Sequence, residues 1–152
     1  MPAAIVPDLA QSLRNSLLAN QTLASMLPIY LDSPTIFTRR PVPPDAPYPM
    51  IVVSPDIAKT DTDGLADLRP IITRDVTVYG SNDTSDNYRD VEEMAYIIFS
   101  MFHRNPMSLF VDTGWNITSV QCQGPRPAPT DDEQTIARAV TVVTQMNFPS
   151  SS

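Results

Sequence analysis

The residue types that most often carry chemistry are scarce in this sequence. It contains one cysteine, Cys122, and one histidine, His103, and the two are not at a zinc-ligand spacing. A nucleophilic site of the Ser–His–Asp or Cys–His kind would have to use His103. His103 ends a predicted helix, where it is expected to complement the helix dipole. Cys122 lies within a predicted strand, where a buried and inert thiol is expected. The sequence therefore predicts neither a metal site nor a nucleophilic site.

Acidic side chains are more frequent, but their spacing singles out no catalytic pair. The segment DTDGLAD at 61–67 has the composition of a calcium loop, yet it lacks the twelve-residue ligand pattern that ends in a glutamate. The four glycines are too dispersed to form a phosphate-binding loop. We therefore expect solvated carboxylates, no bound cofactor and no enzymatic activity. The carboxylates concerned are Asp61, Asp63, Asp67, Asp131, Asp132 and Glu133.

Length and charge narrow the class of protein further. A chain of 152 residues suits a single domain, here residues 1–152, with one hydrophobic core. The formal net charge of −7 argues against a protein that binds nucleic acid by neutralising phosphates, although it permits DNA to slide past. The N-terminus has no signal-peptide pattern, and no run approaches the roughly 20 apolar residues that span a bilayer. The single cysteine fits a reducing, cytosolic compartment.

Two stretches have the apolar spacing of amphipathic helices. The first covers 7–27, where leucines recur at helical intervals and Asn20 is expected either to kink the helix or to cap a second short one. The second covers 81–104, with Ser85 or Asp86 as N-cap and an apolar stripe along one side. The stripe consists of Val91, Met94, Ala95, Ile98, Phe99 and Phe102.

Five segments have the β-branched or alternating composition of strands. They are 35–40, 50–54, 71–80, 115–124 and 135–148. Most links between them are too short for helical crossovers, which favours antiparallel pairing. The sequence predicts an α+β fold, namely an antiparallel or mixed sheet of four to five strands with the two amphipathic helices packed on one face. Such a sheet has edges and a second face that an oligomer can cover.

Stiff and polar segments connect these elements. Prolines are concentrated at 41–49 and in GPRPAPT at 124–130, so both segments are predicted to be extended linkers. Residues 55–69 are acidic and aperiodic, which predicts a long exposed loop that is mobile in the monomer and ordered by a neighbouring subunit. The tail at 148–152 is predicted to fray.

Charged residues within and beside these segments are the candidate contacts with other subunits. They are Arg39, Arg40, Asp61, Asp63, Asp67 and Arg69. The pair Arg39 and Arg40 is too small for a nucleic-acid patch, and a salt bridge to a neighbour and one to the acidic loop remain equally open. Trp115, the single tryptophan, is open to two interpretations, a core residue or an interface anchor.

Taken in order, these elements resemble the tail-terminator or tail-completion proteins of long-tailed bacteriophages and gene transfer agents. The resemblance spans roughly residues 8–147, and its most telling combination is APYPMIVV followed by a D-G loop and then VTVYG. A Leu-rich helix precedes this combination. An amphipathic helix containing DVEEMA at 90–95 and a last strand beginning RAVTV at 138–142 follow it.

The resemblance implies a small α+β subunit that forms a ring with copies of itself, typically a hexamer. Such a ring caps the tail tube and provides the docking surface for the head connector or stopper protein, while DNA passes through the lumen without specific binding. The resemblance implies no catalytic, metal-binding or cofactor-binding residue and no association with a membrane. It also implies that the protein is assembled in the bacterial host cytoplasm and then lies in the tail or neck of the virion. Within the same setting the alternative is a head–tail connector or neck-completion protein.

A hypothesis of a different class is a small-ligand binder or enzyme with a site between the sheet and residues 55–69. It requires a concave pocket with converging polar groups and a titratable residue of perturbed pKa. The sequence shows none at a recognisable spacing, so the assembly hypothesis is preferred.

Overall fold

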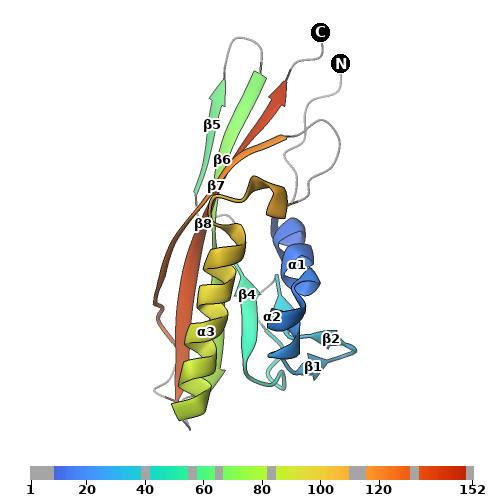
Figure 1. Cartoon of the computed structure of the whole chain (residues 1–152), viewed down its shortest axis with the longest axis vertical. Helices are drawn as coiled ribbons and strands as arrows, with labels where there is room; N and C mark the ends of the chain where they lie inside the picture. The colour runs from blue at the N-terminus through green and yellow to red at the C-terminus, as the bar shows by residue number, and fades with distance from the viewer. Residues whose placement is uncertain are drawn as a thin grey trace.

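A mixed β-sheet forms the framework of the molecule in the computed structural model (Figure 1). The structure describes residues 9–38, 42–54, 58–63, 67–81, 85–109, 116–130 and 134–149. For residues 58–63, 67–70, 85–87 and 147–149 it describes the backbone alone.

The strands lie in the order β3-β4-β6-β8-β7, and β5 pairs with β6 on the same side as β4. Their bounds are β3 (Ile36–Phe37), β4 (Met50–Val53), β5 (Ala58–Asp63), β6 (Asp67–Ser81), β7 (Asn116–Pro127) and β8 (Thr135–Pro149). β3 and β4 are parallel, and every other pairing in this sheet is antiparallel. The predicted mixed α+β sheet is therefore confirmed, with β5 as a strand that the sequence did not predict.

Helices α1 (Leu9–Ala19), α2 (Gln21–Ser25) and α3 (Ser85–Phe102) cover one face of the sheet. Asn20 separates α1 from α2, because its side-chain oxygen accepts a hydrogen bond of 3.0 Å from the backbone N–H of Leu23. This is the N-cap that the sequence suggested for a second short helix. A short 3-10 helix, η1 (Pro106–Ser108), follows α3.

The hydrophobic core lies between these helices and the sheet. Alternate residues of β4 separate cleanly, since Ile51 and Val53 face the helices while Met50 and Val52 belong to a cluster on the other side. The helical stripes and the strands meet in one cluster. Its members include Leu13, Leu17, Leu23, Val91, Met94, Ile98, Phe102, Val76, Val78, Val140 and Val142.

The proline-rich segment covers part of the second face. Ala46 packs with Met50 and Val52, and Tyr30 and Phe37 complete this small cluster with an edge-to-face ring contact at 6.3 Å. Tyr30 belongs to a two-stranded hairpin, β1 (Ile29–Tyr30) and β2 (Ser33–Pro34), that stands apart from the main sheet. The chain thus supplies some of the cover that an oligomer was expected to provide.

Part of the sheet extends beyond the helices (Figure 1). We call this part the arm, comprising 58–63, 67–73, 116–119 and 143–149, and the helix-covered remainder the body. The predicted loop at 55–69 is wrong for most of its length, because 58–63 and 67–69 form a β-hairpin whose register joins Asp61 to Pro70. β5 is a strand because its backbone pairs with β6. Its sequence could not predict this, because apolar and polar residues do not alternate along it.

Two further expectations about connections are corrected. The predicted linker at 124–130 begins inside β7, which runs to Pro127 after a register shift between Gln123 and Arg126. Gly124 takes a φ of 103° there, and an added Cβ would lie 2.9 Å from the carbonyl oxygen of Ala139, so the bulge requires glycine. At the C-terminus, Phe148 and Pro149 pair with Leu68 and Asp67, although the tail was predicted to fray from 148.

Candidate interaction site

The structure gathers four of the predicted interface residues at the end of the arm. Asp61 and Asp63 lie in β5, and Asp67 and Arg69 lie in β6. The register sets Arg69 opposite Thr62 and joins Asp67 to Pro149 of β8. Arg39, Arg40 and Trp115 lie outside the described residues, so the alternatives for them stay open.

His103 and Cys122 come together, but they do not form a nucleophilic pair. The backbone N–H of Cys122 donates a hydrogen bond of 3.0 Å to Nδ1 of His103, so the imidazole accepts through that nitrogen. The Cys122 side chain is buried, and desolvation raises the pKa of its thiol to about 12. The thiol is therefore protonated at neutral pH, as expected of an inert core cysteine.

His103 directly follows α3, and its backbone N–H still donates to the carbonyl oxygen of Phe99 at 2.9 Å, so it lies at the expected end of the helix, while its role at the helix dipole stays a prediction. α3 ends at Phe102, and the chain then turns through Arg104, whose φ is 56°. The backbone N–H of Arg104 donates to the carbonyl oxygen of Val120 at 2.8 Å, beside the bond between Cys122 and His103. These two bonds occupy the outer edge of β7 at 120–122, so the end of α3 caps a strand edge. This contact could not be predicted locally, because it depends on the left-handed turn at Arg104.

A polar network crosses three strands on the face opposite the helices. Arg126 of β7 donates to Thr141 of β8 and to a carboxylate oxygen of Asp75 of β6 at 2.9 Å. Thr141 donates to the other oxygen of the same carboxylate at 2.6 Å. The ion pair neutralises both charges in place, and so this face presents neither a free base nor a free acid at these three positions.

A second ion pair fixes α3 to the sheet. Arg138 of β8 donates from Nε to Glu92 at 3.1 Å and from Nη2 to the hydroxyl of Tyr88. Its guanidinium also lies 5.0 Å from the centre of the Tyr88 ring. Both side-chain partners belong to the first half of α3, so the cluster orients the helix against the sheet.

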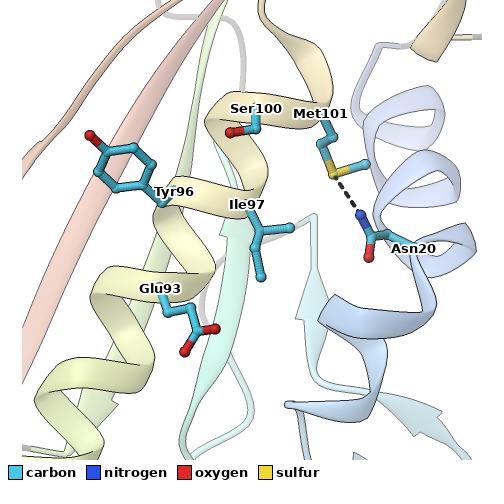
Figure 2. Close-up of a pocket in the computed structure, with 6 residues that line it drawn as sticks. All are labelled: Asn20, Glu93, Tyr96, Ile97, Ser100 and Met101. Atoms are coloured by element: carbon cyan, nitrogen blue, oxygen red, sulfur yellow. Dashed lines mark hydrogen bonds between the residues drawn. The ribbon is translucent and has the colours of Figure 1, made fainter.

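A groove runs between α1 and Asn20 on one side and α3 on the other (Figure 2). One part of it has a volume of about 360 Å³, the next part has about 490 Å³, and both share Asn20 and Met101. Figure 2 shows Ile97 pointing between the helices, and the amide of Asn20 reaching the sulfur of Met101 at 3.7 Å. The other lining residues are Ser12, Asn15, Ser16, Ala19, Glu93, Tyr96, Ser100, Asn105 and Ser108.

The groove is lined mainly by polar, uncharged side chains. Its lining combines hydroxyl and amide groups with Ile97, Met101 and Tyr96, and Glu93 is the single charged residue among those lining it. It is open to solvent along its length. The rival hypothesis of an enzyme placed its site between the sheet and residues 55–69, whose side chains lie outside the described residues, so that hypothesis stays untested. Sequence analysis missed the groove, because serine and asparagine on a helix surface look like ordinary solvent-exposed positions.

Within the described residues, no group of three or more His, Cys, Asp or Glu side chains could hold a metal ion. Among the described helices, none is long and apolar enough to cross a membrane.

Comparison with known proteins identifies the fold. No protein-family model matches the sequence, and no curated protein matches it. Among solved structures, the chain is similar to a chain of "Virion of native gene transfer agent (GTA) particle", with a TM-score of 0.71 at 10% sequence identity. The match covers 91% of this chain and 94% of that chain. The two chains share a fold over nearly their whole lengths.

Proposed function

We propose that this protein is a structural subunit of a phage-like particle, of the tail-terminator type. Its copies form a ring, a hexamer by the family resemblance, that caps the tail tube and offers a docking surface to the head connector or stopper protein. The observation that carries the proposal is the fold shared over nearly the full length with a chain of a gene transfer agent virion.

The charges on the surface of the subunit support the same proposal. Two ion pairs form within the subunit, Asp75 with Arg126 on the open sheet face and Glu92 of α3 with Arg138. With a net charge of −7, such a subunit lets DNA pass through the ring without specific binding. The arm adds a projecting element that a neighbouring subunit or the tail tube can contact. Its end carries Asp61, Asp63, Asp67 and Arg69, the proposed interface residues.

Deletion of the gene in the producing strain tests the proposal. A tail tube without its cap has an open growing end and no surface for the head, so the deletion is expected to give separate heads and tails, with tails of uneven length in electron micrographs. Complementation with the wild-type gene is expected to restore joined particles. Normal, joined particles in the deletion strain would overturn the proposal. Tails of normal length that fail to join would instead favour the connector or neck-completion role.

A further inference from the structure

The end of α3 contacts the outer edge of β7 through two hydrogen bonds. β7 is the last strand in the order β3-β4-β6-β8-β7, and its inner edge pairs with β8. One bond joins backbone groups, since the N–H of Arg104 donates to the carbonyl oxygen of Val120 at 2.8 Å. The other bond ends on a side chain, because the N–H of Cys122 donates to Nδ1 of His103 at 3.0 Å. The second bond therefore depends on the protonation state of an imidazole, whereas the first does not.

Only a neutral His103 can make this contact. A ring nitrogen accepts a hydrogen bond when it carries a lone pair, so acceptance at Nδ1 places the ring proton on Nε2. A proton taken up from solvent binds the lone pair of Nδ1, and both nitrogens of the resulting imidazolium are donors. Two N–H groups would then point at each other across 3.0 Å. The Cys122 amide loses its acceptor, and the charged ring is driven away from the strand edge.

The elements around His103 do not compensate for this loss. β7, η1 and the last two turns of α3 have no carboxylate that could hold a charged imidazole in place. β7 carries two ionisable side chains: the Cys122 thiol, which stays protonated because burial raises its pKa to about 12, and Arg126, which is paired on the face opposite the helices. On α3 the last titratable side chain before His103 is Tyr96, about two helical turns earlier, and the adjacent Arg104 is exposed and cationic. The end of α3 favours a positive charge, but it offers the Cys122 amide no new acceptor.

A single side chain of this protein is suited to respond to mild acid. His103 is the one histidine of the chain, and histidine is the residue type that ordinarily changes charge between about pH 5 and 8. Aspartate and glutamate ordinarily titrate near about pH 4, and lysine and tyrosine at about pH 10. The ring is half-buried, with its centre 4.7 Å from that of Phe99, so solvent protons reach it. A moderate fall in pH therefore acts on this contact before it acts on the carboxylates of the fold.

We propose that His103 is a pH-sensitive latch, which holds the end of α3 on the outer edge of β7 when neutral and releases it when protonated. The inference is independent of the proposed function, since it rests on the hydrogen bonds at one strand edge. Release leaves the N–H of Cys122 without its native acceptor and uncovers the edge at 120–122. The ladder between β6 and β8 is not part of the latch, so the sheet stays folded while its edge opens.

NMR of the wild-type protein tests the latch directly. The Nδ1 and Nε2 signals of His103 report its protonation, and hydrogen exchange reports the protection of the Cys122 amide relative to an unstructured peptide at the same pH. As His103 titrates, the protection of this amide should fall roughly tenfold, whereas the amides of β8, which lies between two strands, should keep theirs. Constant protection at Cys122 while His103 becomes protonated would overturn the latch. So would a His103 that stays neutral down to about pH 5, or an equal loss of protection in β8.

Two variants separate the acceptor from the charge. His103→Asn keeps an oxygen close to the position of Nδ1 but takes up no proton in this range, so the Cys122 amide should stay protected at every pH. His103→Phe has neither acceptor nor charge, so the amide should be poorly protected throughout. A pH-dependent step of the wild-type size in either variant would assign the step to another group and overturn the latch. The gene-deletion phenotype does not depend on these results, so the proposed function and the latch can fail separately.

Discussion

The body and the arm share the same two long strands but are stabilised in different ways. The ladder between β6 and β8 runs from Ser81 opposite Thr135 in the body to Asp67 opposite Pro149 in the arm. In the body, three helices seal one face with fully buried side chains such as Met94 and Phe102. The arm extends past these helices, and β5 at its edge pairs only with β6 among the described strands.

This difference suggests a division of roles, in which the body stabilises the fold and the arm serves assembly. The body has the buried apolar area that drives folding, whereas in the arm the buried side chains among those described include Ile72 and Met146. Because the arm extends past the helices, we expect it to open at lower free-energy cost than the body and to adjust to a neighbour. The variants below test the contrast, from the largest expected effect to the smallest.

Truncation in the body is expected to have the largest effect. Phe102→Ala empties a fully buried position at the end of α3, and should lower the free energy of unfolding by about 3–5 kcal/mol. Tyr96→Ala, on the same helix but 65% exposed, should change it by less than about 0.5 kcal/mol. Urea denaturation measures both. Similar losses for the two variants would mean that α3 does not pack on the sheet as described.

Overpacking beneath α3 is expected to lower the free energy of unfolding by less than the truncation of Phe102 does. An added Cβ at Gly80 would overlap a methyl carbon of Val91, a buried and branched side chain with little freedom to move. Gly80→Ala should therefore destabilise the protein by about 1–3 kcal/mol. In a Val91→Ala background the same change should cost less than about 0.5 kcal/mol, because the clashing methyl groups are gone. If Gly80→Ala lowered the free energy of unfolding by about 1–3 kcal/mol in the Val91→Ala background too, the destabilisation would not come from contact with Val91.

The cap on β7 gives a third prediction. His103→Phe keeps a ring that can stack on Phe99, at 4.7 Å in the native protein, but it removes the acceptor for the Cys122 N–H. An amide left without its partner should cost about 1–3 kcal/mol in thermal or urea unfolding. Arg104→Ala serves as control, since Arg104 pairs with Val120 through its backbone and should stay near wild type. Equal stability of His103→Phe and wild type would contradict the capping role.

The smallest global effect is expected in the arm. Replacing both Thr60 and Asp61 by proline removes at least one hydrogen bond to β6, because N–H groups of adjacent strand residues point to opposite sides. Hydrogen exchange should lose protection within 58–73, while the free energy of global unfolding changes by less than about 1 kcal/mol. Loss of protection in α3 as well would show that arm and body fold as one unit.

The same contrast explains what could be predicted from the sequence. The helices and strands of the body are predicted by the spacing of their apolar residues, as in MIVV at 50–53 and the stripe from Val91 to Phe102. β5 reads AKTDTD, in which no side chain signals burial, so its strand structure follows from pairing with β6 and could not be inferred locally. The overlooked groove and hairpin tip depend on tertiary placement, although the segment PIYLDSP, flanked by prolines, does suggest a turn.

Imaging of assembled particles tests the central claim most directly. A tag on the protein, bound by gold-labelled antibody or resolved by electron microscopy of whole particles, should be found at the junction of tail and head, as a ring one subunit thick. Label along the tail, within the head shell or absent from purified particles would contradict a tail-terminator role for this chain.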